Sequence, residues 1–301
     1  MAIDQVDRVL RRAGCQGWVC ALEVDGAGEA CHDADEPVVT ASVYKMAVAL
    51  EVFRQAAAGR LDPARRLRLA PLGRTPGPTG ISVFADEAEV SVRDLALLML
   101  SVSDNAATDA LTDLVGLDAI NATLRGLGLD RTVIPARLGD VLDWMGQDAG
   151  YRGYRDLSQA DLPPEREAEV MRRILAGRGL DPLATIRSTA REIATLLRLI
   201  WRDEAGPASA CAEVRRLMAL QVTRQRIALG FPRQGVRVAA KSGTYFGLIR
   251  NEAAVISYPS SLRYAVAVFT RARAQWEGEH EIDRAIGQAA ALAVACLRPP
   301  G

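Results

Sequence analysis

Two lysines stand out in a chain that otherwise uses arginine for positive charge. Of the 37 basic residues only Lys45 and Lys241 are lysine, and all the others are arginine. A buried amine can lose its proton, whereas a guanidinium in a protein stays protonated. The two lysines are therefore candidates for proton transfer, or for a compact ammonium group that arginine cannot replace.

Ser42 precedes Lys45 by three residues. Residues 43–58 are expected to form a helix that begins next to Ser42 and ends before Gly59. Side chains three residues apart lie on the same face of a helix, so the amine can reach the hydroxyl. The positive end of the helix dipole also favours the alkoxide that forms when the hydroxyl loses its proton. Ser42 is thus a candidate nucleophile. Taken alone, however, the spacing is more typical of a helix-capping serine beside a solvated lysine.

Two further polar motifs lie downstream. Ser103, Asp104 and Asn105 fall between two expected helices, so they occupy a turn from which side chains can point into a cleft. Alone, this tripeptide is also typical of an ordinary helix cap. Lys241 opens the run K-S-G-T on an expected strand. The second lysine, like the first, therefore lies beside hydroxyl groups.

Alternation of apolar and polar residues predicts strands at residues 17–25, 236–245, 250–258 and 262–270. Between the first strand and the rest, helical patterns cover residues 43–58, 92–102, 106–115, 118–126, 165–177, 188–202 and 208–220, with a long connection at 59–80. A last helix, at residues 280–296, would cover the sheet. This order predicts an α+β fold, in which N- and C-terminal segments form one antiparallel sheet with flanking helices and an all-helical subdomain is inserted into it.

We expect one domain over residues 1–301. Its sheet part comprises approximately residues 1–41 and 221–301, and its helical part approximately residues 42–220. With 49% hydrophobic residues, a chain of this length can bury a large core.

Charge and hydropathy argue against several kinds of partner. Acidic and basic residues number 37 each without a long run of one sign, so neither nucleic acid nor an anionic membrane is an expected partner. No stretch approaches the roughly 18 apolar residues of a membrane span, and the N-terminus lacks the apolar core of a signal peptide. A cytoplasmic location is therefore expected.

Cysteines and histidines are few. An odd number of cysteines scattered among apolar neighbours predicts reduced, buried thiols rather than a disulfide framework. They are Cys15, Cys20, Cys31, Cys211 and Cys296. With only His32 and His280 and no paired cysteines, a zinc site lacks ligands, so neither a metal nor another cofactor is expected.

Taken together and in this order, S-x-x-K, S-D-N and K-S-G form the signature of class A β-lactamases and penicillin-binding proteins. Residues 74–111, which lead into S-D-N, and the run GTYFGLIRNEAAV after K-S-G add to the match. The chain therefore resembles this family over roughly residues 17–298, most weakly between 132 and 180. The resemblance implies the fold described above.

The resemblance implies catalytic roles for five residues. Ser42 is the nucleophile that becomes acylated, Lys45 is its proton acceptor or relay, and Ser103 passes a proton toward the leaving group. Backbone N–H groups of Ser42 and Thr244 form the oxyanion hole. Lys241 lies close to Lys45, and two partly desolvated ammonium groups lower each other's pKa, as a lysine base near neutral pH requires.

The resemblance also implies a set of substrate-binding residues. Asn105 binds the substrate amide, Lys241 and Ser242 hold a substrate carboxylate, and Gly243 belongs to the same stretch of strand. Arg250, nine residues after Lys241, either helps to hold the carboxylate or ends its strand in solvent. The expected partner is a small molecule that carries a carboxylate.

One family motif is missing. Class A β-lactamases carry E-x-x-L-N after S-D-N, and its glutamate activates the water that releases the acyl group, but residues 132–180 contain no match. Asp140 is the nearest acid by spacing and is the possible deacylation base, although aspartate is one methylene shorter. Glu165, Glu167 and Glu169 follow a helical pattern that faces water.

These observations predict a serine acyl-enzyme hydrolase that acts on a β-lactam or a related amide or ester. Three alternatives stay open: an intracellular acyltransferase or cyclase that uses the same acyl-serine, a D-alanyl-D-alanine peptidase, and a non-catalytic ligand binder. The two lysines argue against the binder, because arginine could serve for binding alone. The aromatic residues Trp144, Tyr151 and Tyr154 either select a bulky apolar substrate or pack the 132–180 loop against the core.

Overall fold

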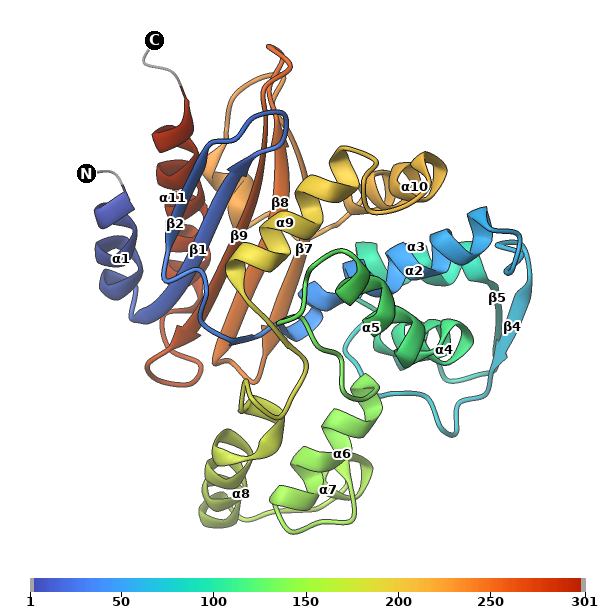
Figure 1. Ribbon diagram of the computed structural model, residues 1–301. Helices are drawn as coiled ribbons and strands as arrows, with labels where there is room; N and C mark the ends of the chain where they lie inside the picture. The colour runs from blue at the N-terminus through green and yellow to red at the C-terminus, as the bar shows by residue number, and fades with distance from the viewer. Residues whose placement is uncertain (1–2, 299–301) are drawn as a thin grey trace.

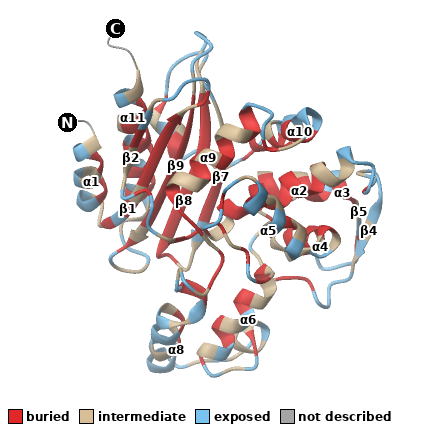
Figure 2. Cartoon of the chain, in the orientation of Figure 1, coloured by how far each residue is buried: buried red, intermediate tan, exposed pale blue. Residues whose placement is uncertain are grey.

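A five-stranded antiparallel sheet is the centre of the fold in a computed structural model, which describes residues 3–298. The strand order is β2-β1-β9-β8-β7, so a hairpin from the start of the chain joins three strands from its end. The strands are β1 (Cys15–Glu23), β2 (Glu29–His32), β7 (Arg237–Tyr245), β8 (Ile249–Ser257) and β9 (Arg263–Ala272). β8 and β9 are buried over nearly their whole length, as Figure 2 shows.

Helices cover both faces of this sheet (Figure 1). α1 (Ile3–Arg12) and α11 (Glu279–Leu297) pack on each other and on one face. α9 (Ala190–Trp201) packs against β1 and β9 from the other face. The sheet is therefore enclosed, which explains why β8 and β9 are buried over nearly their whole length and carry the apolar runs 253–256 and 264–269.

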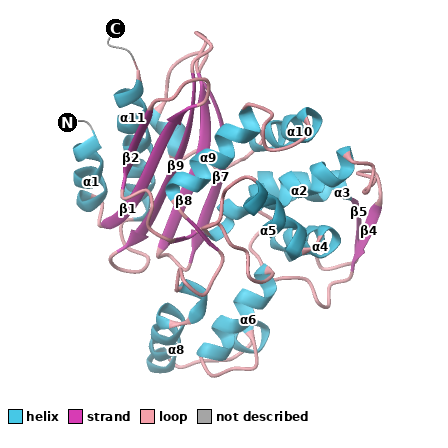
Figure 3. Cartoon of the chain, viewed as in Figure 1, coloured by secondary structure: helices cyan, strands magenta, loops and turns pink. Residues whose placement is uncertain are grey.

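The helical part surrounds α2 (Lys45–Ala57), in which every residue from Lys45 to Phe53 is buried. A helix that is buried on all sides forms the core of its subdomain. Around it pack α3 (Val92–Ser101), α4 (Asn105–Val115), α5 (Leu117–Gly126) and α10 (Ala208–Met218). A small ribbon of β4 (Arg66–Leu69) and β5 (Ala88–Ser91) lies at its outer end (Figure 3).

Residues 132–180 fold into a third group of helices, below the others in Figure 1. They are α6 (Leu138–Asp148), α7 (Tyr154–Ser158) and α8 (Pro164–Ala176). Two strands of two residues each, β3 (Val38–Val39) and β6 (Arg187–Ser188), pair where this group joins the sheet. The single-turn 3-10 helices are η1 (Ala41–Tyr44), η2 (Gly80–Val83), η3 (Arg178–Leu180) and η4 (Ile227–Gly230).

The predicted α+β fold is confirmed: N- and C-terminal segments form one antiparallel sheet, and the helices other than α1 and α11 lie between these segments in the sequence. The four expected strands and all of the expected helices are present, whereas the hairpin strand β2 was not foreseen. The expected helical range 42–220 includes α9, which packs on the sheet. Residues 1–2 and 299–301 of the expected domain lie outside the described residues.

The expectation that all cysteines are reduced is wrong. Cys20 and Cys31 are directly opposite in the β1–β2 hairpin, with their Cα atoms 4.2 Å apart, and they form a disulfide. The pairing depends on the hairpin register, and β2 gave no recognisable strand pattern. Cys15 and Cys211 are buried free thiols, and Cys296 is an exposed one.

Within residues 3–298, no helix combines the length and the apolar character needed to cross a membrane.

Candidate active site

Ser42 lies in the 3-10 turn η1, which continues directly into α2. Ala41, just before it, has a φ of 45°, a conformation that costs energy for a residue with a side chain. Lys45, the first residue of α2, is completely buried, whereas Ser42 is half-buried and lines a cavity. The turn therefore presents the serine to the cavity and sends the lysine beneath it.

The S-D-N turn holds Lys45. The Lys45 Nζ donates to the backbone carbonyl of Ser103 at 2.8 Å and to Asn105 Oδ1 at 2.8 Å, and it lies 3.3 Å from Ser103 Oγ. Asp104 caps α4 by accepting from the N–H of Ala107. Ser103 has a φ of 64°, so the turn itself is strained.

Lys241 reaches the same hydroxyl from strand β7. Its buried Nζ donates to Ser103 Oγ at 3.1 Å and to the carbonyl of Ser242 at 2.8 Å. The Ser103 hydroxyl thus lies within hydrogen-bond distance of both amines. Because a hydroxyl has one proton and can also accept, it can relay a proton when one of the two amines is neutral.

Burial favours the neutral form of both amines. Desolvation lowers the pKa of Lys45 to about 7, although the carboxylates of Asp104 and Asp109 oppose the shift. Desolvation also brings the pKa of Lys241 well below its ordinary value, and the positive charges of Lys45 and Arg226 act in the same direction. A lysine with a pKa near 7 is suited to act as a base at neutral pH.

A cavity of about 730 Å³ lies over these groups. Its polar lining includes the motif residues Ser42, Ser103, Asn105, Ser242 and Thr244. Much of the rest is apolar or aromatic, including Val39, Tyr44, Leu138, Val141, Leu142, Tyr154, Met171, Tyr245, Phe246 and Trp276. Within the part of the chain that the structure describes, no aspartate or glutamate lines this cavity, and no group of three or more acidic, histidine or cysteine side chains could hold a metal.

Strand β7 passes very close to the nucleophile. A Cβ added to Gly243 would lie 2.9 Å from Ser42 N, 2.9 Å from the Thr40 carbonyl oxygen and 3.0 Å from Ala41 Cβ. Only glycine permits this approach. It brings the backbone of Ser42 beside the strand that carries Thr244.

The three motifs lie within a match to a known protein family that extends over nearly the whole chain. The family model described as the beta-lactamase enzyme family matches residues 2–297 of this chain. The chain belongs to the beta-lactamase enzyme family. A curated relative from Streptomyces cacaoi, the beta-lactamase regulatory protein BlaB, is 28% identical over 309 residues, which cover 93% of this chain and 92% of that protein.

Solved structures of this kind share the fold. The β-lactamase from Sphaerobacter thermophilus gives a TM-score of 0.77 at 23% identity and covers 99% of this chain and 98% of that one. A variant of the class A β-lactamase of the last common ancestor of Gram-negative bacteria gives 0.76 at 20% identity, with coverages of 99% and 98%. The protein PBP-A gives 0.76 at 19% identity, with coverages of 98% and 95%. The resemblance inferred from the three motifs is thus confirmed.

Arg250 does not occupy the place expected for it. Its guanidinium pairs with Asp283 and Glu279, it is buried, and it does not line the cavity. Neither reading of this arginine, as a carboxylate anchor or as a solvated strand end, was correct. The side chains of successive strand residues point to opposite faces, and that of Arg250 lies toward α11, which carries its acidic partners.

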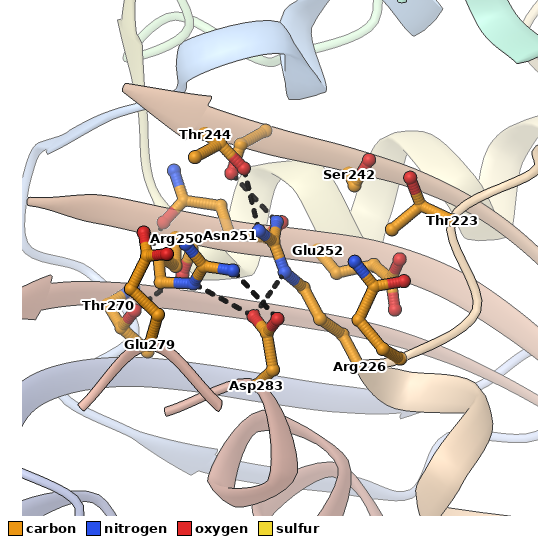
Figure 4. Close-up of polar contacts among 12 residues, drawn as sticks. Thr223, Arg226, Ser242, Thr244, Arg250, Asn251, Glu252, Thr270, Glu279 and Asp283 are labelled. Atoms are coloured by element: carbon orange, nitrogen blue, oxygen red, sulfur yellow. Dashed lines mark hydrogen bonds and ion pairs between the residues drawn. The ribbon is translucent and has the colours of Figure 1, made fainter. Parts of the chain in front are cut away.

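Arg226 instead brings a guanidinium to the cavity strand (Figure 4). It donates to Thr244 Oγ1, to the Gly243 carbonyl at 2.9 Å and to Asp283 Oδ1 at 2.7 Å, and it is 2% exposed. Sequence reasoning missed this residue, since nothing distinguishes one arginine from the many others before the fold is known.

Asp140, the possible deacylation base, is also misplaced for that role. It caps α6 and pairs with Arg137, with an Oδ1–Nη2 distance of 3.1 Å, and it does not line the cavity. The Arg137 guanidinium lowers the pKa of Asp140, which makes the carboxylate a weaker base. Its spacing from S-D-N was a poor guide, because the cavity side of α6 carries Leu138, Val141 and Leu142.

The other acids of this region are no closer to the chemistry. Glu165, Glu167 and Glu169 lie on α8 outside the cavity lining, and Glu169 pairs with Arg173. A different carboxylate organises the segment: buried Asp109 accepts from the N–H groups of Leu138 at 2.9 Å and Gly139 at 2.7 Å. This carboxylate therefore holds the start of α6.

Aromatic residues of the cavity were foreseen only in part. Tyr154 lines the cavity, whereas Trp144 and Tyr151 do not and pack against the hydrophobic core. Tyr44 and Tyr245 also line it, and both were missed. Their place inside S-x-x-K and directly after K-S-G-T was the signal that could have found them.

Proposed function

We propose that this protein is a serine acyl-enzyme that opens β-lactams or related amides and esters by acylation of Ser42. The observation that carries the proposal is the meeting of Lys45 and Lys241 at the Ser103 hydroxyl, beside a cavity that Ser42 lines. Binding alone does not require a buried amine beside a hydroxyl, whereas proton transfer requires an amine that can become neutral.

In this proposal, neutral Lys45 accepts the proton of the Ser42 hydroxyl as Oγ attacks the substrate carbonyl carbon. A bond forms between Oγ and carbon, and the carbonyl electrons move to oxygen, where the N–H groups of Ser42 and Thr244 stabilise the negative charge. When the tetrahedral intermediate collapses, the bond to the leaving nitrogen or oxygen breaks. The proton reaches that atom from Lys45 through Ser103, which leaves an ester on Ser42.

Substrate anchoring falls to the K-S-G-T strand and to the S-D-N turn. Lys241, Ser242 and Thr244 supply an amine and two hydroxyls for a substrate carboxylate, whose negative charge favours the protonated form of the Lys241 amine. Arg226 donates to Thr244 from behind and adds positive charge without entering the cavity. Asn105, which already holds Lys45, is the candidate contact for a substrate amide.

A second candidate is covalent capture of a substrate with slow release. It is favoured by the cavity lining, which includes no aspartate or glutamate among the described residues to activate a water. The relative from Streptomyces cacaoi is named a regulatory protein, and one solved PBP-A structure is an acyl-enzyme complex with penicillin G. Acylation is common to both candidates, and they differ only in the fate of the ester.

Intact-protein mass spectrometry tests the proposal. The protein is incubated with a penicillin, a cephalosporin and simple activated esters, alongside Ser42→Ala. We expect the wild type to gain the mass of one acyl group and the variant to gain none. If no compound adds mass or is hydrolysed by the wild type, or if Ser42→Ala is still acylated, the proposal is wrong.

A further inference from the structure

Two cross-strand neighbours contact the segment that leads into Ser42. Gly243 on β7 and Asn251 on β8 are paired directly in the antiparallel ladder, so they lie side by side on one face of the sheet. The backbone of residues 40–42 packs on Gly243 at distances that exclude a Cβ. Asn251, which is labelled in Figure 4, is completely buried.

The Asn251 side chain holds this segment. Its Nδ2 donates to the carbonyl oxygens of Val39 at 2.9 Å and Thr40 at 3.2 Å, and its Oδ1 accepts from the N–H of Thr270 at 3.0 Å. A carboxamide offers two N–H donors and an acceptor, and all of them are used here. One side chain therefore joins the segment before Ser42 to strands β8 and β9.

A stable sheet alone does not require this arrangement. Ile249 pairs with Arg271 and Glu252 with Val268, but between them Thr270 directs its N–H to the Asn251 side chain. Apolar and β-branched side chains are the usual occupants of a buried strand interior, because they need no hydrogen-bond partners. The polar residue at this position is explained by the segment that it holds.

Ala41 links this attachment to the nucleophile. Its φ of 45° is unfavourable, and such conformations persist only where surrounding contacts fix them. Thr40, on its N-terminal side, also donates from N to the Ile186 carbonyl at 3.2 Å, so Asn251 supplies the attachment to the central sheet. We propose that Asn251 is a positioning residue, which fixes the carbonyls of Val39 and Thr40 and thereby orients Ser42 toward the cavity.

This inference rests on the proposed function in one respect, namely that Ser42 is the acylated group. The variants Asn251→Asp, which keeps the shape but loses both N–H donors, and Asn251→Leu are tested by stopped-flow acylation with a chromogenic cephalosporin. We expect the limiting acylation rate to fall about tenfold to a hundredfold, because small misplacements of a reacting group have effects of this size. The substrate concentration at half-maximal rate should stay within about threefold, since Asn251 does not line the active-site cavity.

Asn121 provides a matched control. Its Nδ2 donates to the carbonyls of Leu117 and Ile134, and its Oδ1 accepts from the N–H of Ile134, so it makes the same three bonds in the helical part. Asn121→Leu should lower the free energy of unfolding but leave the limiting acylation rate within about twofold. Equal loss of rate in this control, or an unchanged rate in both Asn251 variants, would overturn the positioning role.

Hydrogen exchange tests whether Asn251 holds this segment without relying on acylation of Ser42. Peptides that cover residues 38–45 should exchange faster in the Asn251 variants than in the wild type and in Asn121→Leu. Unchanged exchange there overturns the inference even if the rate falls. If the wild type cannot be acylated, the proposed function fails, while faster exchange would still support the attachment of this segment by Asn251.

Discussion

Lys45 and Lys241 meet at the Ser103 hydroxyl but approach it from different neighbours. Lys45 lies one helical turn after Ser42 and is held by acceptors of the S-D-N turn. Lys241 lies on the strand whose next residues carry the Ser242 and Thr244 hydroxyls into the cavity. We therefore assign proton transfer to the first lysine and substrate anchoring to the second.

We expect the acylation rate to rise with pH through about 7 and to level off above it. The neutral amine of Lys45 accepts the serine proton, and burial lowers its pKa to about 7, so the active form accumulates as the pH rises through that value. Lys45→Arg should lose roughly 10²- to 10⁴-fold in rate, since arginine keeps the charge but does not release its proton. Stopped-flow acylation from pH 5 to 9 measures both, and a flat wild-type profile would contradict the assignment.

Lys241→Ala should weaken binding of substrates that carry a carboxylate more than binding of neutral esters. The lost contact is charge-assisted and directed to a single substrate group, so we expect KM to rise about tenfold for the first class only. Matched pairs of acid and methyl ester measure the difference. Equal losses on both members of a pair would place Lys241 in the proton relay instead.

Residue types and short spacings could be read from the sequence where function constrains them locally. Lys45 and Lys241 stood out because arginine replaces lysine elsewhere, and their motifs are short enough to recognise. Arg226 could not be found in this way, because its contact with Thr244 depends on the packing of η4 beside β7. Arg250 was misassigned because its acidic partners, Asp283 and Glu279, lie on a helix that is distant in the sequence.

At the scale of elements, α6 bears on the release of the proposed acyl group. The segment expected to carry a water-activating acid instead presents Leu138, Val141 and Leu142 to the cavity. Leu138 is the first residue of α6, where the helix dipole favours a negative charge. This position is therefore a suitable one at which to introduce a carboxylate.

We expect Leu138→Glu to shorten the lifetime of the acyl-enzyme, by up to about 10²-fold if the new carboxylate orients a water as a general base. Leu138→Gln has the same shape without the charge and should not shorten it. Loss of acyl mass over time measures both variants. Equal lifetimes in the two variants would exclude a carboxylate at this position as the missing group.

Asp140→Asn also tests the release of the acyl group, because it removes the acid that the sequence suggested as the deacylation base. Asp140 pairs with Arg137 outside the cavity, so neither acylation nor release should change by more than about twofold. Burst kinetics with a chromogenic cephalosporin separate the two phases. A slow phase suppressed a hundredfold would restore Asp140 as the base.

Long elements with strong periodicity were predictable, and short ones were not. β7, β8 and β9 are runs of nine or ten residues, each with a clear pattern. β3 and β6 have two residues each, and pairing with a distant segment rather than their own sequence makes them strands. The fold of residues 132–180 was obscure for a related reason, since buried Asp109 on α4 holds the start of α6.

At the scale of the whole molecule, the disulfide and the candidate site lie at opposite edges of the sheet. Cys20 and Cys31 join β1 to β2, whereas β7 forms the far edge. We expect reduction to lower the free energy of unfolding by up to roughly 3 kcal/mol, from the closure of a loop of this length, without changing the acylation rate. Urea unfolding and stopped-flow acylation with and without dithiothreitol test this, with the double variant Cys20→Ala/Cys31→Ala as the control that reductant should not affect.

The strand order also bears on when this chemistry can arise during synthesis. Ser42 and Ser103 are synthesised long before Lys241, which contacts Ser103 in the folded protein. Strand β1 can pair along its inner edge only after β9 has been synthesised. A ribosome that has completed the helical middle of the chain therefore carries a serine without its full set of partners, next to an unfinished sheet. The proposed reactivity toward an acyl donor therefore requires the last third of the polypeptide, and we expect a prematurely terminated chain to be inert.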